Sequence, residues 1–532
     1  MSEEKNKFIG ALDIGTTTIR CMIFTRSLQI CGYASEQVQL IYPKVGYIEI
    51  DPEQFWSSVI NVIRAAINNA KIAPSELECL GITTQRSTFI TWNRDTGKYF
   101  HNFIVWNDLR AKDLVKKWND NILLKSFQGV AKFLYLITRN KRFLAGSVMK
   151  FMNSQVTVRL AWMIRNNDDL KKAIQNKSAL FGTIDTWLLH KFRQGHRDYD
   201  KTTIDHITDI TNATATGLYD PFQLNWADWS FSLYGLSLDI MPTVVDNSHD
   251  FGVINQSIFG SEIKIGCSIA DQSASMWGSC CFQRGDVKVT LGTGTFMNLN
   301  TGKECHASVY GLYPLVAWRN FNRETKSTEV MYCVEGQSSD TGSLIRWGID
   351  FGLFTDPSCS SDMAYSVDDS EEIFFIPAFS GLGAPLNDAK AATGVIGIRP
   401  TTTKAHIVRA LLESIAYRVA QLYKCTLEET DFKFSIIRVD GGVSRNDFVC
   451  QLLANLTGLK VERTDNSELS VLGTAFLAGL NCGIFKSREE LVQTRNVERI
   501  FHPQPELFKR IQSKFERWQI AVERFCDWYD DS

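Results

Sequence analysis

The chain has 532 residues, with 57 lysines and arginines, 59 aspartates and glutamates, and a net charge of −2 at pH 7. Its length exceeds one ordinary domain and predicts two of similar size, because single hydrophobic cores stop growing near roughly 250–300 residues. The balanced charge excludes a general attraction to nucleic acid or anionic membranes, and no apolar run approaches the roughly 18 residues of a membrane-spanning helix.

Thirteen cysteines are scattered through the chain without a CxxC pair. Cys280 and Cys281 are adjacent, and neighbouring cysteines cannot easily satisfy disulfide geometry. The first seven residues, MSEEKNK, are polar and mixed in charge, which matches neither a signal peptide nor a transit peptide. These features predict free thiols in a cytoplasmic protein.

The first predicted element is a β-hairpin, with strands at residues 8–13 and 19–24 around the turn Gly15-Thr16-Thr17-Thr18. Glycine lets the backbone turn tightly and approach a ligand. Successive amides in such a turn form an anion site, to which threonine hydroxyls add donors. Asp13 ends the first strand and could hold a metal-bound water. The alternative is an ordinary hairpin with a β-branched turn.

Between residues 51 and 166 the pattern predicts helices, strands and an insertion. Asp51 is a suitable N-cap before Pro52, and apolar residues share one helical face as far as residue 69. The stretch 120–149 is basic and apolar without a clear period, and we interpret it as an insertion. The other elements are expected at 80–84 (strand), 89–92 (strand) and 153–166 (helix).

Polar side chains follow the strand at 80–84. Arg86 supplies donors of fixed geometry for substrate oxygens, and Trp106 could form an apolar wall against the C–H groups of a polyol. The alternative is a surface turn and a core tryptophan.

Asp271 and Gln272 follow another predicted strand, at 263–269. A carboxylate at a strand end is suited to accept a proton from a substrate hydroxyl. The alternative role for Asp271 is a helix N-cap.

The second half of the chain repeats the first motif. A strand at 287–291 leads into Gly292-Thr293-Gly294-Thr295 and then into a strand at 296–299. The repetition predicts two related domains that face each other. The turn is not a dinucleotide-binding motif, which would need glycine in place of Met297.

The C-terminal region contains a glycine turn between a strand and a helix. The strand at 436–439 ends in Asp440-Gly441-Gly442, and Asn446 precedes a predicted helix at 447–456. This arrangement commonly contacts nucleotides. Amphipathic helices are expected at 403–424 and at 508–528, the latter packing an aromatic face.

Taken in order, these segments resemble the FGGY family of carbohydrate kinases, and within it the glycerol kinases. The matching segments are DIGTTT (13–18), TQR (84–86), VW (105–106), GTIDTWL (182–188), TDITNA (208–213), ADQ (270–272), LGTGT (291–295), PAFSGLGAP (377–385), LESIAYR (412–418) and DGG (440–442).

The resemblance implies an α/β fold of two ribonuclease-H-like domains, of the actin and hexokinase ATPase type, at 1–265 and 266–532 around a central cleft. It implies ATP-dependent phosphorylation of glycerol, with Mg²⁺ oriented by Asp13 through water. Its implied site residues are Asp271 as catalytic base; Arg86, Ser87, Trp106, Asp271 and Gln272 around the polyol; and Asp13, Gly15, Thr16, Thr17, Thr18, Gly292, Thr293, Gly294, Thr295, Gly441, Gly442 and Asn446 around ATP.

Three positions depart from the family pattern. Ser87 stands where glycerol kinases carry glutamate, Ser154 falls near a pocket tyrosine, and Leu386-Asn387 replaces a Tyr-Trp pair. The departures leave two alternatives open. One is a kinase for another small polyol or a ketose, and the other is a nucleotide-binding regulator without kinase turnover. A homo-oligomer is also left open.

Overall fold

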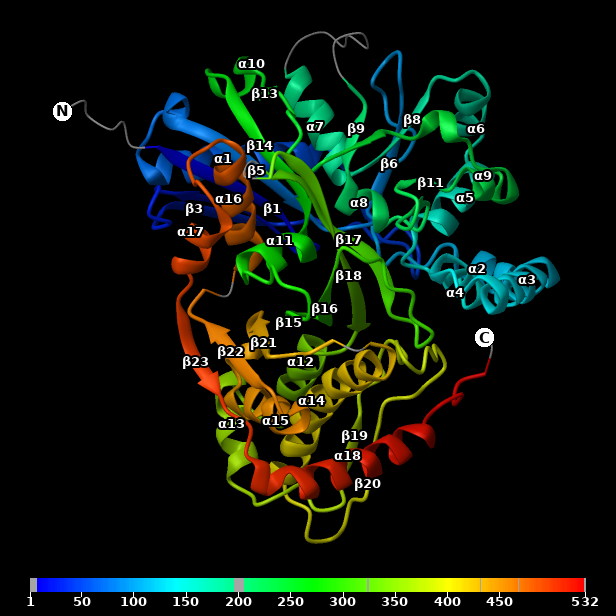
Figure 1. The fold of residues 1–532 in the computed structure, drawn as a ribbon, viewed down its shortest axis with the longest axis vertical. Coiled ribbons are helices and arrows are strands. Elements are labelled where there is room, and N and C mark those ends of the chain that lie inside the picture. The colour runs from blue at the N-terminus through cyan, green and yellow to red at the C-terminus, as the bar shows by residue number, and fades with distance from the viewer. Residues whose placement is uncertain (1–6, 196–204, 323–324, 431, 467, 531–532) are drawn as a thin grey trace. The chain divides into compact units, whose positions relative to one another are not determined.

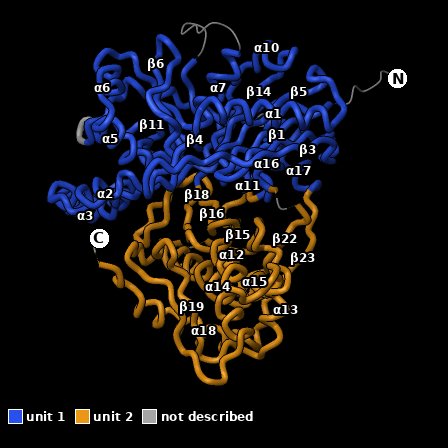
Figure 2. The backbone as a smooth tube through the Cα atoms, turned by 180° about the vertical axis from the view of Figure 1, so that it is seen from behind, with its two compact units in different colours: residues 1–280, 315–332, 469–494 blue, residues 281–314, 333–468, 495–532 orange. Residues whose placement is uncertain are grey.

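The computed structural model describes residues 7–195, 205–322, 325–430, 432–466 and 468–530 (Figure 1). The chain forms two compact units, each built from three separate stretches of sequence (Figure 2). Unit 1 contains residues 1–280, 315–332 and 469–494, and unit 2 contains 281–314, 333–468 and 495–532. The predicted division after residue 265 stays a prediction.

Unit 1 is organised around a six-stranded sheet with the strand order β13-β14-β5-β1-β2-β3. The strands β1, β5 and β14 are parallel neighbours, and Thr84 of β5 pairs with both Ile14 and Ala270. The carboxyl ends of these three strands therefore meet at one edge of the sheet. The bounds are β1 Phe8–Ile14, β2 Thr18–Phe24, β3 Ile30–Gln37, β5 Leu77–Thr84, β13 Val253–Ile254 and β14 Ile263–Ala270.

The predicted N-terminal elements are confirmed. The strands β1 and β2 pair antiparallel up to Ile14 and Ile19, which leaves the short turn between them. Helix α1 Pro52–Ala70 begins after Asp51, whose carboxylate accepts the backbone N–H groups of Glu53 and Gln54 at 3.0 and 2.8 Å. Its apolar face packs into the core beside β2 and β3.

Helix α16 Leu469–Asn481 comes from the far end of the chain and packs on β1, β5 and β14. Small residues allow this close approach. A Cβ atom on Gly81 would lie 2.7 Å from the Thr474 side chain, and one on Gly473 would lie 1.8 Å from the carbonyl oxygen of Ala274 in α11 Asp271–Gly278.

A second sheet of unit 1 has the order β4-β7-β6-β8.

The helix predicted at 153–166 is confirmed as α5. Residues 120–149 are largely helical, although the sequence predicted no periodic element there. The bounds are β4 Glu49–Ile50, β6 Phe89–Asn93, β7 Phe103–Ile104, β8 Ala179–Thr183, α2 Lys112–Asn119, α3 Ile122–Thr138, α4 Lys141–Ser147, α5 Val156–Asn166, α6 Asp168–Gln175, α7 Ile184–Gln194, β9 Ile207–Asp209, α8 Ile210–Thr214, β10 Tyr219–Asp220, β11 Asn225–Trp226, α9 Asp228–Tyr234, β12 Thr243–Val245, α10 Gln256–Phe259 and α17 Arg488–Gln493.

Unit 2 contains most of a seven-stranded sheet with the order β17-β18-β16-β15-β21-β22-β23. The hairpin of β15 and β16 and the strand β21 confirm the predicted elements, and β15 and β21 run parallel. The bounds are β15 Val287–Leu291, β16 Thr295–Gly302, β17 Tyr313–Asn322, β18 Ser327–Ser338, β19 Phe374–Ile376, β20 Gly394–Ile396, β21 Ile436–Asp440, β22 Lys460–Thr464, β23 Val497–Phe501, α12 Gly342–Asp350, α13 Pro357–Tyr365, α14 Lys404–Glu429, α15 Asp447–Thr457 and α18 Phe508–Glu523.

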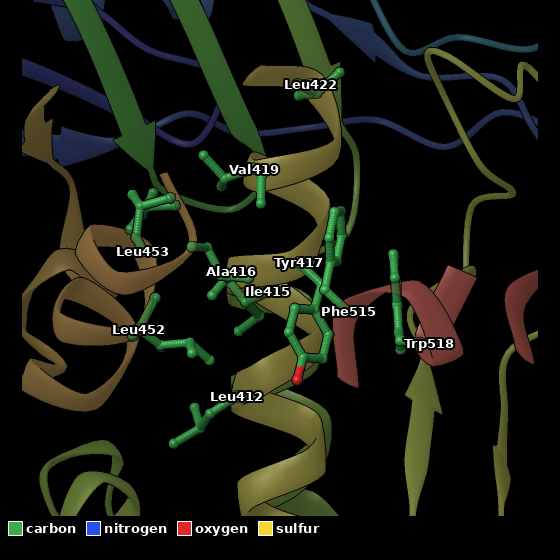
Figure 3. Packing of buried hydrophobic residues seen from close by; sticks show 14 of the residues in the cluster. Leu412, Ile415, Ala416, Tyr417, Val419, Leu422, Leu452, Leu453, Phe515 and Trp518 are labelled. Atoms are coloured by element: carbon green, nitrogen blue, oxygen red, sulfur yellow. The ribbon is translucent and has the colours of Figure 1, made fainter. Parts of the chain in front are cut away.

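The core of unit 2 forms where α14, α15 and α18 meet (Figure 3). Phe515 and Trp518 of α18 lie 5.6 and 5.4 Å from the ring of Tyr417 in α14. The predicted aromatic face of the last helix is therefore confirmed. Among the described residues, no helix is both long enough and apolar enough to cross a membrane.

Candidate active site

The carboxyl edge of the large sheet in unit 1 brings together several predicted site residues. Asp13 is the second-last residue of β1 and the turn at 15–18 follows this strand, while Arg86 comes after β5 and Asp271 after β14. Ligands of parallel sheets bind at this edge because loops of different strands converge there. The separate strand-end motifs of the sequence thus become one cluster.

Asp271 is paired with Arg86. The Nε atom of Arg86 lies 3.5 Å from Oδ1 of Asp271, and the two side chains are 14% and 27% exposed. The same oxygen accepts the backbone N–H of Gln272 at 2.7 Å. Asp271 is therefore a partly accessible carboxylate held in place by a cation, which suits it to receive a proton from a hydroxyl group. Gln272 is buried beside it in α11.

Asp13 is a buried carboxylate with few stabilising partners. The pKa of Asp13 is raised to about 6, chiefly by burial and also by the negative charge of Asp271, while Arg20 and Ser470 act in the opposite direction. The Oγ atom of Ser470 donates to Oδ2 of Asp13 at 3.1 Å, and Nε of Arg20 is 3.9 Å away. Two neighbouring carboxylates that repel each other form a favourable environment for a cation.

The first turn (residues 15–18) is closed by a hydrogen bond from the Gly15 N–H to the Thr18 carbonyl oxygen at 3.0 Å. Gln85 supports the turn from the end of β5: its backbone N–H donates to Ile14 O at 2.7 Å, and its Nε2 donates to Gly15 O at 3.2 Å. Thr17 is exposed at the tip of the turn. The turn is thus held rigidly while its outer surface remains open to a ligand.

Trp106 connects this turn to the neighbouring loop. Its indole Nε1 donates to Oγ1 of Thr16 at 2.9 Å, and its backbone N–H donates to Oγ1 of Thr88 at 3.1 Å. Trp106 is half-buried and packs against the core of unit 1. Trp106 therefore combines packing against the core with a polar contact to the first turn, and its role beside a polyol stays a prediction.

Ser87 has a left-handed backbone, with φ of 63°. Its hydroxyl donates to the carbonyl oxygen of Ala215 at 2.8 Å and is buried. The Ser87 carbonyl oxygen accepts Nη2 of Arg159 at 2.8 Å, and the same nitrogen donates to Ser154 O at 2.7 Å. Arg159 also donates to Val105 O at 2.8 Å. The buried guanidinium of Arg159 thus forms hydrogen bonds with all three segments around the predicted polyol pocket.

Asp209 is the centre of a hydrogen-bond network at the end of β14. Its carboxylate accepts the Ser268 hydroxyl at 2.9 Å and the Asn247 amide at 3.1 Å. It also accepts the hydroxyl of Thr211, whose oxygen accepts the Ala270 N–H at 2.8 Å. This network fixes the residue that precedes Asp271.

In unit 2, the second turn (residues 292–295) packs against the start of α12. The N–H of Gly342 donates to Gly292 O and Thr293 O at 3.0 and 2.9 Å, and the hydroxyls of Thr295 and Thr341 are 2.7 Å apart. A Cβ atom on Gly294 would lie 2.8 Å from Ser338 O, so glycine is required there. The predicted turn is therefore rigid, with Thr293 exposed at its tip.

The glycine turn after β21 lies beside the second turn, because β21 and β15 are paired. Gly441 has φ of 86° and ψ of 167°, and a Cβ atom there would lie 2.6 Å from Leu291 O. Gly442 has open space around it. Asn446 caps α15 by accepting the Val449 N–H at 3.0 Å and is otherwise buried.

The sequence-based prediction missed several residues of these clusters, among them Ser470, Arg159, Thr341 and Gly342. Ser470 lies 457 positions from Asp13 and has no local motif. Arg159 resembles any helical arginine in sequence. Thr341 and Gly342 belong to the run Ser338-Ser339-Asp340-Thr341-Gly342, whose small polar residues and glycine could have indicated another tight turn.

No group of three or more histidines, cysteines, aspartates or glutamates in the described part of the chain could hold a metal ion. A magnesium site does not need such a group, because Mg²⁺ commonly binds through one or two carboxylates together with substrate phosphates.

Family models match both halves of the chain. Residues 8–278 match the N-terminal domain of the FGGY family of carbohydrate kinases, and residues 287–482 match its C-terminal domain. Glycerol kinase 5 of Danio rerio is 43% identical over 99% of this chain and 98% of its own length. Glycerol kinase 2 of Thermotoga maritima is 34% identical over 98% of this chain and 99% of its own.

A solved structure agrees with these relatives. Plasmodium falciparum glycerol kinase with ADP superposes with a TM-score of 0.85 at 28% identity, covering 98% of each chain. Together with the two α/β units, this likeness confirms the predicted fold class of two ribonuclease-H-like domains.

Proposed function

We propose that this chain, which belongs to the FGGY family of carbohydrate kinases, phosphorylates glycerol with ATP to give glycerol 3-phosphate. The observation that carries the proposal is the Asp271–Arg86 pair at the carboxyl edge of β5 and β14. The names of the similar proteins, several of them glycerol kinases and one solved with ADP, support the same acceptor and nucleotide.

In this mechanism Asp271 accepts the proton of the terminal hydroxyl as its oxygen attacks the γ-phosphorus of ATP. A bond forms between that oxygen and phosphorus, the bond to the β,γ-bridging oxygen breaks, and ADP leaves. Arg86 orients the base and offers donors to the other hydroxyls, while Trp106 covers the C–H groups. Most of the catalysis is positioning, because phosphoryl transfer needs little covalent chemistry from the protein.

The two turns, at 15–18 and 292–295, would contact the phosphates of ATP through backbone amides and threonine hydroxyls. Gly441, Gly442 and Asn446 would lie near the adenosine. Asp13 would hold Mg²⁺ through water, which fits a buried carboxylate whose pKa is raised to about 6 beside a second negative charge. When bound, Mg²⁺ neutralises charge on the β- and γ-phosphates.

Asp271→Asn tests the proposed base. Loss of a general base typically lowers turnover by about 10²- to 10⁴-fold, whereas ATP affinity, measured by calorimetry, should stay close to that of the wild type. Asp250→Asn is the matched control, since this exposed aspartate of unit 1 lies outside the site. An Asp271→Asn variant that keeps most of its glycerol-dependent ADP production would show that Asp271 is not the base.

Ser87 favours a second candidate acceptor, another small polyol or a ketose. A hydrogen bond to a charged group contributes about 1.5–3 kcal/mol, so serine in place of the family's glutamate could weaken glycerol binding roughly 10- to 150-fold. The Ser87 hydroxyl is also engaged by Ala215 O. A panel of polyols and ketoses with ATP decides between the acceptors, and clear preference for a sugar would exclude glycerol. ATP binding without turnover on any acceptor would instead indicate a regulator.

We place the protein in the cytoplasm. All thirteen cysteines lie in the described residues, none of them forms a disulfide there, and most are buried, as expected for a reducing compartment. Cell fractionation tests this placement, and recovery of the protein in a secreted or lumenal fraction would contradict it.

A further inference from the structure

Helix α3 projects from unit 1 together with α2 and α4 (Figures 1 and 2). Its inner face packs against α4, with Leu124 and Ala131 buried. Phe127 stacks on Trp229 of α9, with the ring centroids 5.3 Å apart. These contacts cover only one side of α3.

The outer face of α3 is also apolar. Ile122, Val130, Phe133 and Ile137 are 75%, 59%, 62% and 65% exposed. With 3.6 residues per turn, these four side chains fall within about 80° of one another around the helix. Scattered exposed apolar residues are ordinary, but a continuous exposed stripe marks an interaction surface. We call these four residues the outer stripe.

The segment that carries the outer stripe is uniformly basic. Residues 121–150 contain no aspartate or glutamate, and their cations are Lys125, Lys132, Arg139, Lys141, Arg142 and Lys150. Lys125 and Lys132 are spaced by seven residues, so they lie on one edge of the helix next to the outer stripe, and Arg139 follows at the C-cap of α3. The charge of Arg142 is neutralised by the carboxylate of Asp220, at 2.7 Å.

We propose that α3 lies in the plane of an anionic membrane surface. The outer stripe inserts among the acyl chains, and Lys125, Lys132 and Arg139 contact negatively charged headgroups. An interfacial helix combines an apolar face with lysines and arginines in this way. The charge complementarity favours a lipid surface over a second copy of this chain, since two copies would oppose the same cations. The net charge of the chain, −2, makes this attraction local.

The surface is tested with the full-length protein and vesicles of phosphatidylcholine, with and without phosphatidylserine. Binding should require phosphatidylserine and weaken with salt. Each lysine near such a surface strengthens binding about fivefold, so Lys125→Gln with Lys132→Gln should weaken it about 25-fold. Phe133→Ser with Ile137→Ser should weaken it by more than about tenfold, because both side chains leave the acyl region.

Matched controls change similar side chains elsewhere. Ile398→Ser removes an apolar side chain that is 60% exposed on unit 2, and Lys424→Gln with Lys460→Gln removes two exposed cations. These controls should bind vesicles like the wild type. All variants should keep kinase turnover, since α3 lies outside the proposed site, and retained turnover also shows that they fold.

Three outcomes would overturn the proposal. The first is failure of the wild type to bind phosphatidylserine vesicles, and the second is equal binding to both vesicle types. The third is a concentration-dependent dimer that Phe133→Ser with Ile137→Ser abolishes, which would assign the outer stripe to a second copy of this chain.

Discussion

Asp13→Asn should stabilise the nucleotide-free protein while abolishing its kinase activity. The change keeps the shape of the side chain and removes its charge. Burial raises the pKa of Asp13 from 3.8 to about 6 in the folded state. Folding therefore favours the protonated carboxyl, and the ionised form found at neutral pH is destabilising.

The size of the stability change follows from the difference between the pKa values of Asp13 in the unfolded and folded states. A carboxyl that binds its proton more tightly in the folded state makes stability fall as pH rises, here between about pH 4 and 6. The difference between 3.8 and about 6 corresponds to about 3 kcal/mol in the free energy of unfolding. An asparagine side chain cannot ionise, so the Asp13→Asn variant should match the wild type near about pH 4 and exceed it by about 3 kcal/mol at about pH 7.

Urea unfolding of the wild type and of the Asp13→Asn variant, without nucleotide and from about pH 4.5 to 7.5, measures the gap between their free energies of unfolding. The negative charge of Asp271 contributes to the raised pKa of Asp13, so the gap should be smaller in an Asp271→Asn background. A gap that does not change with pH, or an Asp13→Asn variant less stable than the wild type at neutral pH, would contradict a raised pKa of Asp13 in the folded state.

Three further substitutions test the supports of the site. Arg159→Met leaves the carbonyl oxygens of five residues without their buried donor. It should therefore destabilise unit 1 by about 4 kcal/mol in urea unfolding and raise KM for the acceptor more than for ATP. Gly441→Ala forces a side chain into a glycine-only conformation and against Leu291 O. The free energy of unfolding should fall by about 2 kcal/mol or more, and KM for ATP should rise. An unchanged KM for ATP would contradict the adenosine assignment. Asp209→Ala removes the acceptor that holds Thr211, which in turn accepts the N–H of Ala270 at the end of β14. We expect kcat to fall at least about tenfold while ATP affinity is retained. An unaltered kcat would show that this hydrogen-bond network is not needed for turnover.

Much of the fold is predictable from the sequence because local rules act there without competition. The hairpin of β1 and β2 follows from two short apolar strands around a polar glycine turn, and α1 follows from its periodicity and the Asp51 cap. The turn at 292–295 follows from the same chemistry. Each of these depends on neighbours within a few residues.

Helix α3 shows where periodicity fails. A period is visible only when apolar residues avoid one face of the helix. In α3 both the packed inner face and the outer stripe are apolar, so the contrast disappears from the sequence. The helix is revealed only by the structure, and the reason for its missing period is the feature that indicates its interaction surface.

The strand-end residues Asp13, Arg86 and Asp271 were predicted from sequence alone, because a polar side chain at or just beyond the end of an apolar strand is a local pattern. Their grouping depends on the strand order β14-β5-β1, which the tertiary fold decides. The same is true of Ser470, which reaches Asp13 only because α16 returns to unit 1. The sequence predicts which groups carry the chemistry, and long-range packing decides their partners and, for Asp13, the proton affinity.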